Sequence, residues 1–559
     1  MTSQDNALNE IFNDIANACQ VQSAVLKEIL DLQKDTEYGK KYDFANIKTI
    51  KQFQDKHPLT DYEHYYEIIE KISRTGDYKK LVSEPIVIFL ESSGTTGKSK
   101  ILLSTKTLSS KSGKIEQAGT ALCRKTYFQN RINKDASRGL NLANASYLKT
   151  TPSGIPQGNA FSLALRNAPL PAQKNITKLF TSPFPIFLIS DFRVSFYCHL
   201  LFALIEPNLA YISSNYVSSI WELMQILEKE WKNLIQDIES GEINENLNLD
   251  VSIQEELSKI LKPDFERAEL LKKEFKKGFK DIFPRIWPNL TYIKCITSGS
   301  MEIYVNNLKK YIGKIPLCST NYGASESWCG INLDLKNSKP LYTITPHTAF
   351  FEFIPISEME AKNPITVDLT SLKVNESYEL VITTFTGLYR YRLGDIVKCV
   401  KYNFKSPVVK YLYRKGSLLN IDAEKVSEIE IFTAIHNSLK VFENSTQIVD
   451  YTTSICLKSF PHKYILYIEL SKNIKSELEI NRYRDEIDKT LLSLNILYRK
   501  KRTESNIIDK PEIKLTKTGS FKALKEKILA TKGAEPQFKM PRLLKEEDLI
   551  SYIENFLLN

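Results

Sequence analysis

The sequence predicts an α/β protein: a large N-terminal domain of layered sheets and helices, with a β-rich subdomain, and then a small α+β domain. Helical and strand-like segments alternate as far as about residue 300, which is typical of α/β layers. Strand patterns then fill residues 341–414, and a new unit follows them. A chain of 559 residues is too long for one ordinary core. We expect two to four compact units and divide the chain into domains 1–415 and 416–559.

Composition restricts the classes of function. Apolar residues make up 42% and charged residues 25%, and the apolar run 197–205 is far too short to span a membrane. The net charge of +10 comes from dispersed lysines, so we expect a small anionic ligand rather than a nucleic acid. The eight cysteines contain no CxxC pair, which favours reduced, mostly buried thiols. We therefore expect a cytoplasmic monomer with no membrane partner.

The first 85 residues have mainly helical patterns. The apolar residues of the N-terminus recur at helical spacing, as in an amphipathic helix rather than a signal peptide; they are Leu8, Ile11, Phe12, Ile15 and Cys19. Residues 61–72 form the clearest helical pattern. Residues 225–280 are rich in Lys and Glu and predict long surface helices.

A cluster of Gly, Ser, Thr and Lys follows a short apolar run at 86–90. That run predicts a buried strand, and the cluster reads SSGTTGKSK from Ser92 to Lys100. Backbone N–H groups and hydroxyls in such a loop can bind phosphate, and Lys98 or Lys100 adds charge. The glycine spacing does not fit the P-loop of nucleotide hydrolases. The alternative is a simple Gly/Ser turn between strands.

Strand patterns continue toward the C-terminus. AFFEFIPI, YELVITT, IVKCVKY and PVVKYLY follow one another within 341–414, and a hinge is expected near 414–419. Beyond it, TTSICLK and YILYIEL are expected to pair around Pro461. The helix after them takes its apolar face from Leu478, Ile480, Tyr483, Ile487, Leu491 and Leu494.

Three motifs together resemble those of the adenylate-forming superfamily. They are the loop from Ser92 to Lys100, NYGASES within 319–333, and TGLYRYRLGD within 386–400. They occur in that family's order and at plausible separations. The finer resemblance is to the auxin-responsive acyl-acid-amido synthetases, carried by stretches such as TPSGIPQG, IWPNLTYIKCITSGSMEIY and PQFKMPR.

The resemblance implies a ligase that uses ATP and Mg²⁺. A carboxylic acid would attack the α-phosphate, pyrophosphate would leave, and an amino acid or amine would then take the acyl group and release AMP. The second, smaller domain would be mobile. The loop of this chain is one residue shorter than in common plant members, which favours a bacterial-type member.

The resemblance also assigns residues. The loop residues Ser92, Ser93, Gly94, Thr95 and Thr96 would hold the phosphates. Glu326 would bind Mg²⁺, a cation that prefers carboxylate oxygens, although a surface carboxylate is the alternative. The remaining contacts with ATP would come from Tyr322 and Gly323 at the adenine, Ser325 near the α-phosphate, and Ser298 and Gly299 along the pocket.

Asp395 is expected to accept hydrogen bonds from both ribose hydroxyls. Arg414 resembles the arginine of this family that also contacts the ribose or the phosphates. The alternative interpretation is an exposed arginine with no contact to the nucleotide. Tyr389 and Tyr391 flank these positions, but aromatic residues in a strand more often belong to the core.

A lysine of the second domain would neutralise charge during adenylation. Lys539, in QFKMPR, matches the family's own motif, and Lys522, in TGSFKALK, resembles the general superfamily motif. We favour Lys539. Two other functions stay open: a ligase that passes the acyl group to coenzyme A or a carrier, and a nucleotide-binding protein without catalysis.

Overall fold

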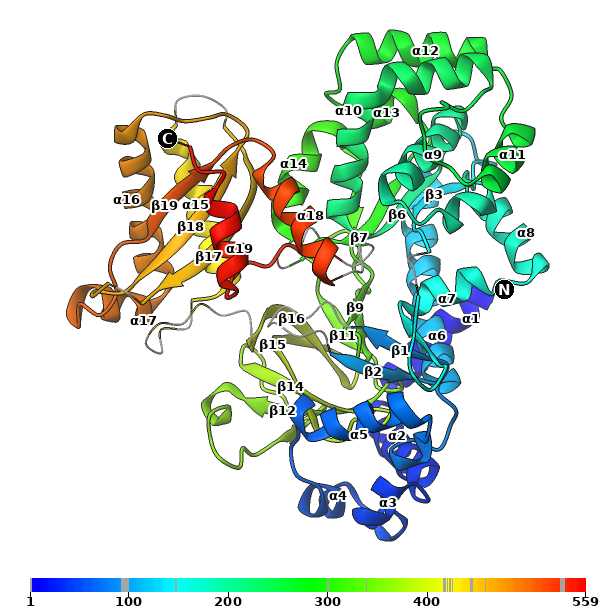
Figure 1. Ribbon diagram of the computed structural model, residues 1–559. Coiled ribbons are helices and arrows are strands. Elements are labelled where there is room, and N and C mark those ends of the chain that lie inside the picture. The colour runs from blue at the N-terminus through cyan, green and yellow to red at the C-terminus, as the bar shows by residue number, and fades with distance from the viewer. Residues whose placement is uncertain are drawn as a thin grey trace. The chain divides into compact units, whose positions relative to one another are not determined.

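A computed structural model gives the structure of the protein (Figure 1). It describes residues 3–91, 100–145, 148–298, 301–337, 339–415, 419, 421, 424, 426–442, 446–457, 459–532 and 538–558. These residues divide into two compact units. The first unit contains residues 3–91, 100–298 and 308–411, and the second contains 301–307 and 412–558.

Helices form the start of the first unit, as predicted. They are α1 (Ser3–Ala16), α2 (Ala18–Gln33), α3 (Glu37–Lys41), α4 (Ile50–Lys56) and α5 (Tyr62–Thr75). Local sequence explains the ends of α5. The Asp61 carboxylate accepts a hydrogen bond from the backbone N–H of His64, and Gly76 ends the helix with φ of 74°.

The apolar face of α1 is narrower than the sequence predicted. Leu8, Ile11 and Ile15 are buried, but Phe12 is 38% exposed; Cys19 is exposed and lies beyond the end of α1, on α2. The expected helical spacing is correct, but the partner helix α6 (Lys106–Tyr127) covers only one stripe of α1.

The prediction of mostly buried thiols is confirmed. All eight cysteines lie in the described residues, and six of them are buried.

A parallel sheet of order β3-β6-β7-β8 forms one layer of the first unit. Its strands are β3 (Gly139–Leu142), β6 (Tyr211–Tyr216), β7 (Tyr292–Ile296) and β8 (Leu317–Cys318). The helices between these strands include α9 (Phe192–Ile205), α10 (Val217–Ser240), α11 (Val251–Ile260), α12 (Phe265–Lys276), α13 (Ile282–Ile286) and α14 (Glu302–Ile312). This alternation confirms the predicted α/β layering.

A smaller sheet of order β2-β1-β5-β4 flanks the predicted phosphate loop. It consists of β1 (Ile88–Glu91), β2 (Ile101–Ser104), β4 (Lys149–Thr150) and β5 (Pro156–Gly158). Strand β1 pairs antiparallel with β2 and parallel with β5. Two short helices, α7 (Ala160–Arg166) and α8 (Leu170–Leu179), follow β5.

The strand-rich segment after residue 320 belongs to one sheet of order β13-β12-β14-β15-β16-β11-β10-β9. Its strands are β9 (Asn321–Gly323), β10 (Trp328–Ile331), β11 (Tyr342–Ile344), β12 (Phe350–Pro355), β13 (Val367–Asp368), β14 (Ser377–Thr383), β15 (Tyr391–Asn403) and β16 (Ser406–Arg414). Its apolar side chains share a core with α2 and α5, two helices that lie beside this sheet in Figure 1. The predicted β-rich subdomain is therefore present.

The second unit is an α+β domain, as predicted. Its sheet, β17 (Ile448–Cys456), β18 (Lys463–Leu470) and β19 (Glu512–Thr516), pairs β17 with β18 in antiparallel fashion around Pro461. Alternate residues of β18 enter two cores. One core lies under α15 (Glu428–Asn437), α16 (Glu477–Leu494) and α17 (Ile496–Arg499), and the other under α18 (Ser520–Lys532) and α19 (Glu547–Glu554).

Helix α16 corrects one expectation about this domain. Tyr483, Ile487 and Leu491 are buried, but Leu478 is 61% and Leu494 is 42% exposed. These two residues lie at the ends of the helix, beyond the part that covers the sheet.

None of the helices in the described part of the chain combines the length and the apolar character of a membrane-spanning segment.

A buried ion pair fixes the chain where it enters β15. Arg390 has a positive φ of 44°, which is unusual for a residue other than glycine. Its guanidinium donates to the carboxylate of Glu352, with Nη2 to Oε1 at 3.0 Å, and to the backbone carbonyl oxygens of Gln54 and His57. Glu352 is 1% exposed. The pair thus connects β12, the entrance to β15 and the N-terminal helices.

We predict that Arg390→Met lowers the free energy of unfolding by about 3–5 kcal/mol, because it leaves the Glu352 carboxylate buried without its partner. Urea denaturation followed by circular dichroism measures this. Lys51→Met is the control, since the Lys51–Asp55 pair is exposed and its loss costs less than about 1 kcal/mol. Equal losses in the two variants would contradict the structural role of the buried pair.

Candidate active site

The hairpin β9–β10 carries the second predicted motif. A hydrogen bond from the Ala324 N–H to the Ser327 carbonyl oxygen, 2.9 Å, closes its turn. Within the turn the side chain of Glu326 is 3% exposed, and Ser325 is half-buried. A Cβ atom on Gly323 would lie 2.7 Å from the Trp328 ring. The glycine of the motif is therefore explained by close packing.

Strand β15 carries the third motif and is interrupted by a bulge. Glu379 of β14 pairs with Ile396, and Val381 pairs with Arg392, so one residue of β14 faces residues 393–395. Gly394 lies in this bulge with φ of 80°, a conformation that favours glycine. Bulges redirect side chains beside active sites. Here the bulge carries Asp395, which is 2% exposed.

The hydroxyl of Tyr322 donates a hydrogen bond of 2.7 Å to Oδ2 of Asp395. Tyr322 lies on β9 and Asp395 on β15, and three strands separate β9 from β15 in the sheet. In a flat sheet these two strands would lie about 19 Å apart. The sheet must therefore curve strongly. The ring of Tyr322 packs against those of Tyr342 and Tyr411, with centroids 5.6 and 5.8 Å apart. Burial and the adjacent Asp395 carboxylate raise the pKa of Tyr322 well above its usual value.

Ser298 is connected to this aromatic group. It follows β7 and is half-buried, and its hydroxyl lies near that of Tyr342, which is hydrogen-bonded to the Ser319 hydroxyl at 2.8 Å. The predicted site residues Ser298, Tyr322 and Asp395 therefore come together in the first unit. Six other predicted contacts lie outside the described residues: Ser92, Ser93, Gly94, Thr95, Thr96 and Gly299.

A second polar connection reaches Glu326. The Lys100 ammonium donates to the Tyr391 hydroxyl at 3.0 Å, and that hydroxyl donates to Oε1 of Glu326 at 3.4 Å. The Lys100 nitrogen also lies 5.5 Å from the ring centre of Tyr62 and 5.7 Å from that of Tyr391. The ring of Tyr391 is fully buried, as its assignment to the core predicted. Nothing in the sequence indicated that its hydroxyl would connect Lys100 with Glu326.

The other predicted residues belong to the second unit. Arg414 is half-buried at the end of β16, and Lys522 is exposed on α18. The motif around Lys522 has a structural function: the buried Glu469 carboxylate accepts hydrogen bonds from the backbone N–H groups of Gly519 and Phe521, at 2.7 and 2.9 Å. These contacts hold the first turn of α18.

Lys539 is half-buried in a segment that is attached to β17. The backbone N–H of Thr453 donates to the carbonyl oxygen of Arg542 at 3.0 Å, and the Thr452 hydroxyl donates to that of Pro541 at 2.6 Å. The Arg542 guanidinium is buried and pairs with Asp450. Since Arg542 lies three residues after Lys539, these contacts restrict the position of that lysine.

Lys539 also lies near a buried carboxylate. Burial raises the pKa of Glu428, and the charges of Arg542 and Lys539 oppose that shift. Glu428 is the first residue of α15. The charge of Lys539 therefore acts on Glu428 from a half-buried position, whereas Lys522 is exposed.

A buried serine–histidine pair lies elsewhere in the first unit. The Ser182 hydroxyl is 2.6 Å from Nδ1 of His199, and Nε2 of His199 donates to the Ala143 carbonyl oxygen at 3.0 Å. Ser182 and His199 are both fully buried, and burial lowers the pKa of His199 to about 4. A substrate cannot reach this pair, so it stabilises the fold rather than acting as nucleophile and base.

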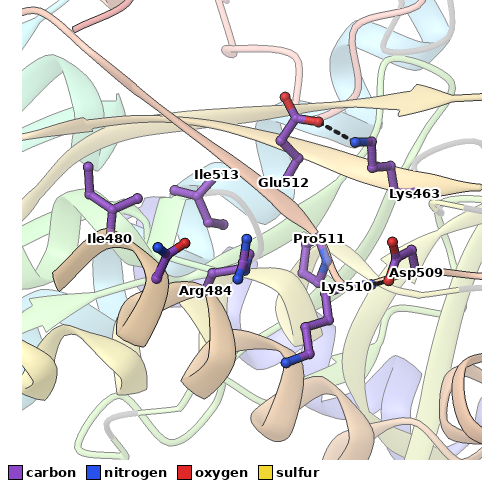
Figure 2. A pocket seen from close by; sticks show the side chains of 9 residues that line it. Lys463, Ile480, Arg484, Asp509, Lys510, Pro511, Glu512 and Ile513 are labelled. Carbon is purple, nitrogen blue, oxygen red and sulfur yellow. Dashed lines mark hydrogen bonds and ion pairs between the residues drawn. The ribbon is translucent and has the colours of Figure 1, made fainter. Parts of the chain in front are cut away.

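Figure 2 shows a groove on the second unit. Its lysines have carboxylate partners: Lys463 pairs with Glu512 at 2.6 Å (Figure 2), and Lys510 pairs with Asp485, outside the lining, at 2.9 Å. The lining includes Arg484 and Asp509. Three cations, Lys463, Arg484 and Lys510, and two carboxylates, Asp509 and Glu512, line the groove, so its net charge is only +1 and its attraction for an anionic ligand is weak. None of the predicted site residues lines it.

The donor set fits a magnesium ion that arrives bound to phosphate. Within the described residues, no group of three or more His, Cys, Asp and Glu side chains surrounds a cation position. Mg²⁺ is commonly held by one or two carboxylates together with substrate phosphates and water. The single buried carboxylate of Glu326 is sufficient for that arrangement, which needs no metal cage made by the protein alone.

The fold and these motifs define the class of adenylate-forming enzymes. A 2-hydroxyisobutyryl-CoA ligase in its postadenylation state matches with a TM-score of 0.53, covering 96% of this chain and 90% of the ligase. At 10% identity this likeness shows the fold alone. The family is defined more narrowly by the sequence.

The chain belongs to the GH3 family. The GH3 N-terminal domain matches residues 7–317, the central domain matches 342–414, and the C-terminal domain matches 430–548. Indole-3-acetic acid-amido synthetase GH3.3 of Arabidopsis thaliana is 30% identical, covering 99% of this chain and 94% of the relative. Jasmonoyl-L-amino acid synthetase GH3.5 of Oryza sativa subsp. japonica is also 30% identical, covering 97% and 95%.

A solved structure of the same family supports this assignment. The GH3.15 acyl acid amido synthetase matches with a TM-score of 0.88 at 26% identity, covering all of this chain and 96% of the other. The predicted family, fold class and enzyme class are thus confirmed: the protein is a ligase of the acyl-acid amido synthetase type. The two curated relatives are plant enzymes and give the bacterial-type assignment no support.

We predict that Tyr322 and Asp395 are energetically coupled by about 1.5–3 kcal/mol, the contribution of a hydrogen bond to a charged group. A double-mutant cycle of Tyr322→Phe, Asp395→Asn and the double variant, measured by urea unfolding, gives the coupling. Additive effects of the two substitutions would show that the curvature does not bring the two side chains together.

Proposed function

We propose that the protein uses ATP and Mg²⁺ to convert a small-molecule carboxylic acid into an acyl-adenylate, and then transfers the acyl group to an amino acid or another amine. The observation that carries this proposal is the pair of buried carboxylates in one unit: Asp395, which accepts from Tyr322, and Glu326, which is linked to Lys100 through the Tyr391 hydroxyl. Family membership supports it. The name of the rice relative, a jasmonoyl-L-amino acid synthetase, favours an amino-acid acceptor.

Asp395 would hold the ribose. A carboxylate has about four acceptor sites, so Asp395 can accept from the Tyr322 hydroxyl on the protein side and from both ribose hydroxyls on the other. The contact with Tyr322 orients the carboxylate before the nucleotide arrives. The ring of Tyr322, supported by those of Tyr342 and Tyr411, would form a wall for adenine together with Gly323, and Ser298 would line the pocket.

Glu326 would hold the magnesium ion, which when bound neutralises phosphate charge and favours departure of pyrophosphate. Ser325 would lie near the α-phosphate. The loop residues from Ser92 to Thr96 would hold the phosphates, an assignment that rests on the sequence. Little covalent chemistry is required from side chains, because orientation and charge neutralisation provide most of the catalysis.

The reaction would proceed in two steps. In the first, a carboxylate oxygen forms a bond to the α-phosphorus of ATP and the bond to the pyrophosphate oxygen breaks. In the second, an amine nitrogen bonds to the acyl carbon, the bond from that carbon to the AMP oxygen breaks, and the amine loses a proton.

The C-terminal domain, residues 416–559, would be a mobile lid. Lys539 is the favoured lysine for the first step, with Lys522 and Arg414 as further candidates.

The identity of the acid depends on the shape of its pocket. We therefore propose only its class, a small organic carboxylic acid. Composition supports action as a cytoplasmic monomer without membrane or nucleic-acid partners, and the shorter loop supports a bacterial-type member.

We predict Mg²⁺-dependent exchange of radiolabelled pyrophosphate into ATP in the presence of one acid from a panel that includes indole-3-acetic, jasmonic, phenoxyalkanoic and benzoic acids. Asp395→Ala should reduce exchange about 100-fold or more, because it removes a charged contact with the ribose. Lys51→Met, an exposed surface change, should leave exchange unaltered.

Amide formation is then tested with each amino acid, and coenzyme A is the competing acceptor. AMP release and an amide product support the proposal. A thioester product instead of an amide, or no exchange with any acid while ATP still binds, would overturn it.

A further inference from the structure

The Tyr391 hydroxyl lies between a cation and an anion. It accepts from the Lys100 ammonium at 3.0 Å and lies 3.4 Å from Oε1 of Glu326. Lysine can only donate hydrogen bonds, so the single proton of Tyr391 is directed to the carboxylate. The order of donation is thus fixed: Lys100 to Tyr391 to Glu326.

Burial makes this order energetically important. Tyr391 is fully buried and Glu326 is 3% exposed, so the carboxylate requires a compensating charge or donors. Lys100 supplies the charge through the hydroxyl, and the faces of Tyr62 and Tyr391 stabilise its ammonium. The longer Tyr391–Glu326 distance is common for hydrogen bonds of an active site before substrate binds.

The backbone around Tyr391 is held firmly. The N–H of Arg392 donates to the carbonyl oxygen of Thr60 at 2.8 Å, and the N–H of Thr60 donates to that of Arg390 at 3.0 Å. On one side of Tyr391 lies Arg390, with its ion pair to Glu352, and on the other side lies Arg392, which pairs with Glu379. The position of the Tyr391 hydroxyl is therefore set by the fold rather than by its two polar partners.

We propose that Tyr391 is a positioning residue of this site: it orients the Glu326 carboxylate toward a phosphate-bound cation and holds the Lys100 ammonium beside the same carboxylate. Lys100 is then the counter-ion of Glu326 when no cation is present, and a second positive group beside the phosphates when nucleotide is bound. The inference rests on the proposed function, since it assumes that Glu326 binds the magnesium ion of ATP. Hydrogen-bond partners of metal-binding carboxylates orient them and tune metal affinity.

The chain offers a matched control. Tyr389, two residues before Tyr391, is also fully buried, and its hydroxyl has no hydrogen-bond partner among the described residues. Tyr389→Phe and Tyr391→Phe thus remove the same atom from the same segment. Only the second removes the link between Lys100 and Glu326.

The first measurement is the Mg²⁺ concentration that gives half-maximal pyrophosphate exchange. We expect Tyr391→Phe to raise it about 10–100-fold, with the maximal rate largely recovered at high Mg²⁺ and a smaller change in the KM for the acid. Tyr389→Phe should match the natural protein. Equal Mg²⁺ dependence in the two variants, or a loss of rate that Mg²⁺ does not restore, would overturn the inference.

The second measurement needs no turnover. ATP with Mg²⁺ should raise the unfolding temperature of the natural protein and of Tyr389→Phe more than ATP with EDTA does, because a tighter ligand stabilises more. In Tyr391→Phe this difference should be much smaller. If the natural protein shows this difference but no exchange with any acid, the proposed reaction fails while the inference still stands.

Lys100→Met tests the other end of the link, and would be decisive if Tyr391→Phe did not fold. It should weaken ATP binding and raise the Mg²⁺ requirement. Lys106→Met, an exposed lysine at the start of α6, is its control. Identical behaviour of the two lysine variants would overturn the assignment of Lys100.

Discussion

The ion pair of Arg390 with Glu352 is the contact on which the geometry of the site depends. A positive φ at a residue other than glycine costs about 1–3 kcal/mol, and it persists only where surrounding contacts enforce it. Here the guanidinium donates to Glu352 and to the carbonyl oxygens of Gln54 and His57. The backbone turn at Arg390 begins β15 and places Tyr391 next to Lys100 and Glu326. A relaxed turn would direct Tyr391 elsewhere.

Two further departures from a regular sheet complete the arrangement. The bulge at Gly394 changes the direction of the Asp395 side chain, and the curvature of the sheet brings Tyr322 from a strand four steps away. The remainder of the sheet is a rigid support, because its apolar face shares a core with the N-terminal helices. The candidate site is therefore built from local irregularities in one well-packed sheet, a pattern that is common where function requires strained backbone.

Much of the fold could be predicted from the sequence, because its signals are local. Asp61 and Gly76 mark the ends of a helix, and YILYIEL is apolar on both faces because both faces of β18 are covered. Glu326 and Asp395 could be selected from motifs. The function of the Tyr391 hydroxyl could not, because its partners are brought to it by the curvature of the sheet and by packing with β2. Exposure at Phe12 and Leu478 was missed for a similar reason, since helical periodicity gives the apolar face but not how far the partner extends.

The central claim is that the site activates a carboxylic acid by joining it to AMP. The most direct test uses the acid with both carboxyl oxygens labelled with ¹⁸O, ATP, Mg²⁺ and an amino acid, followed by mass spectrometry of the products. In an acyl-adenylate mechanism one carboxyl oxygen leaves with the phosphorus, so one ¹⁸O atom should appear in AMP and one should remain in the amide. Label in inorganic phosphate with formation of ADP, or no label in AMP, would contradict the account.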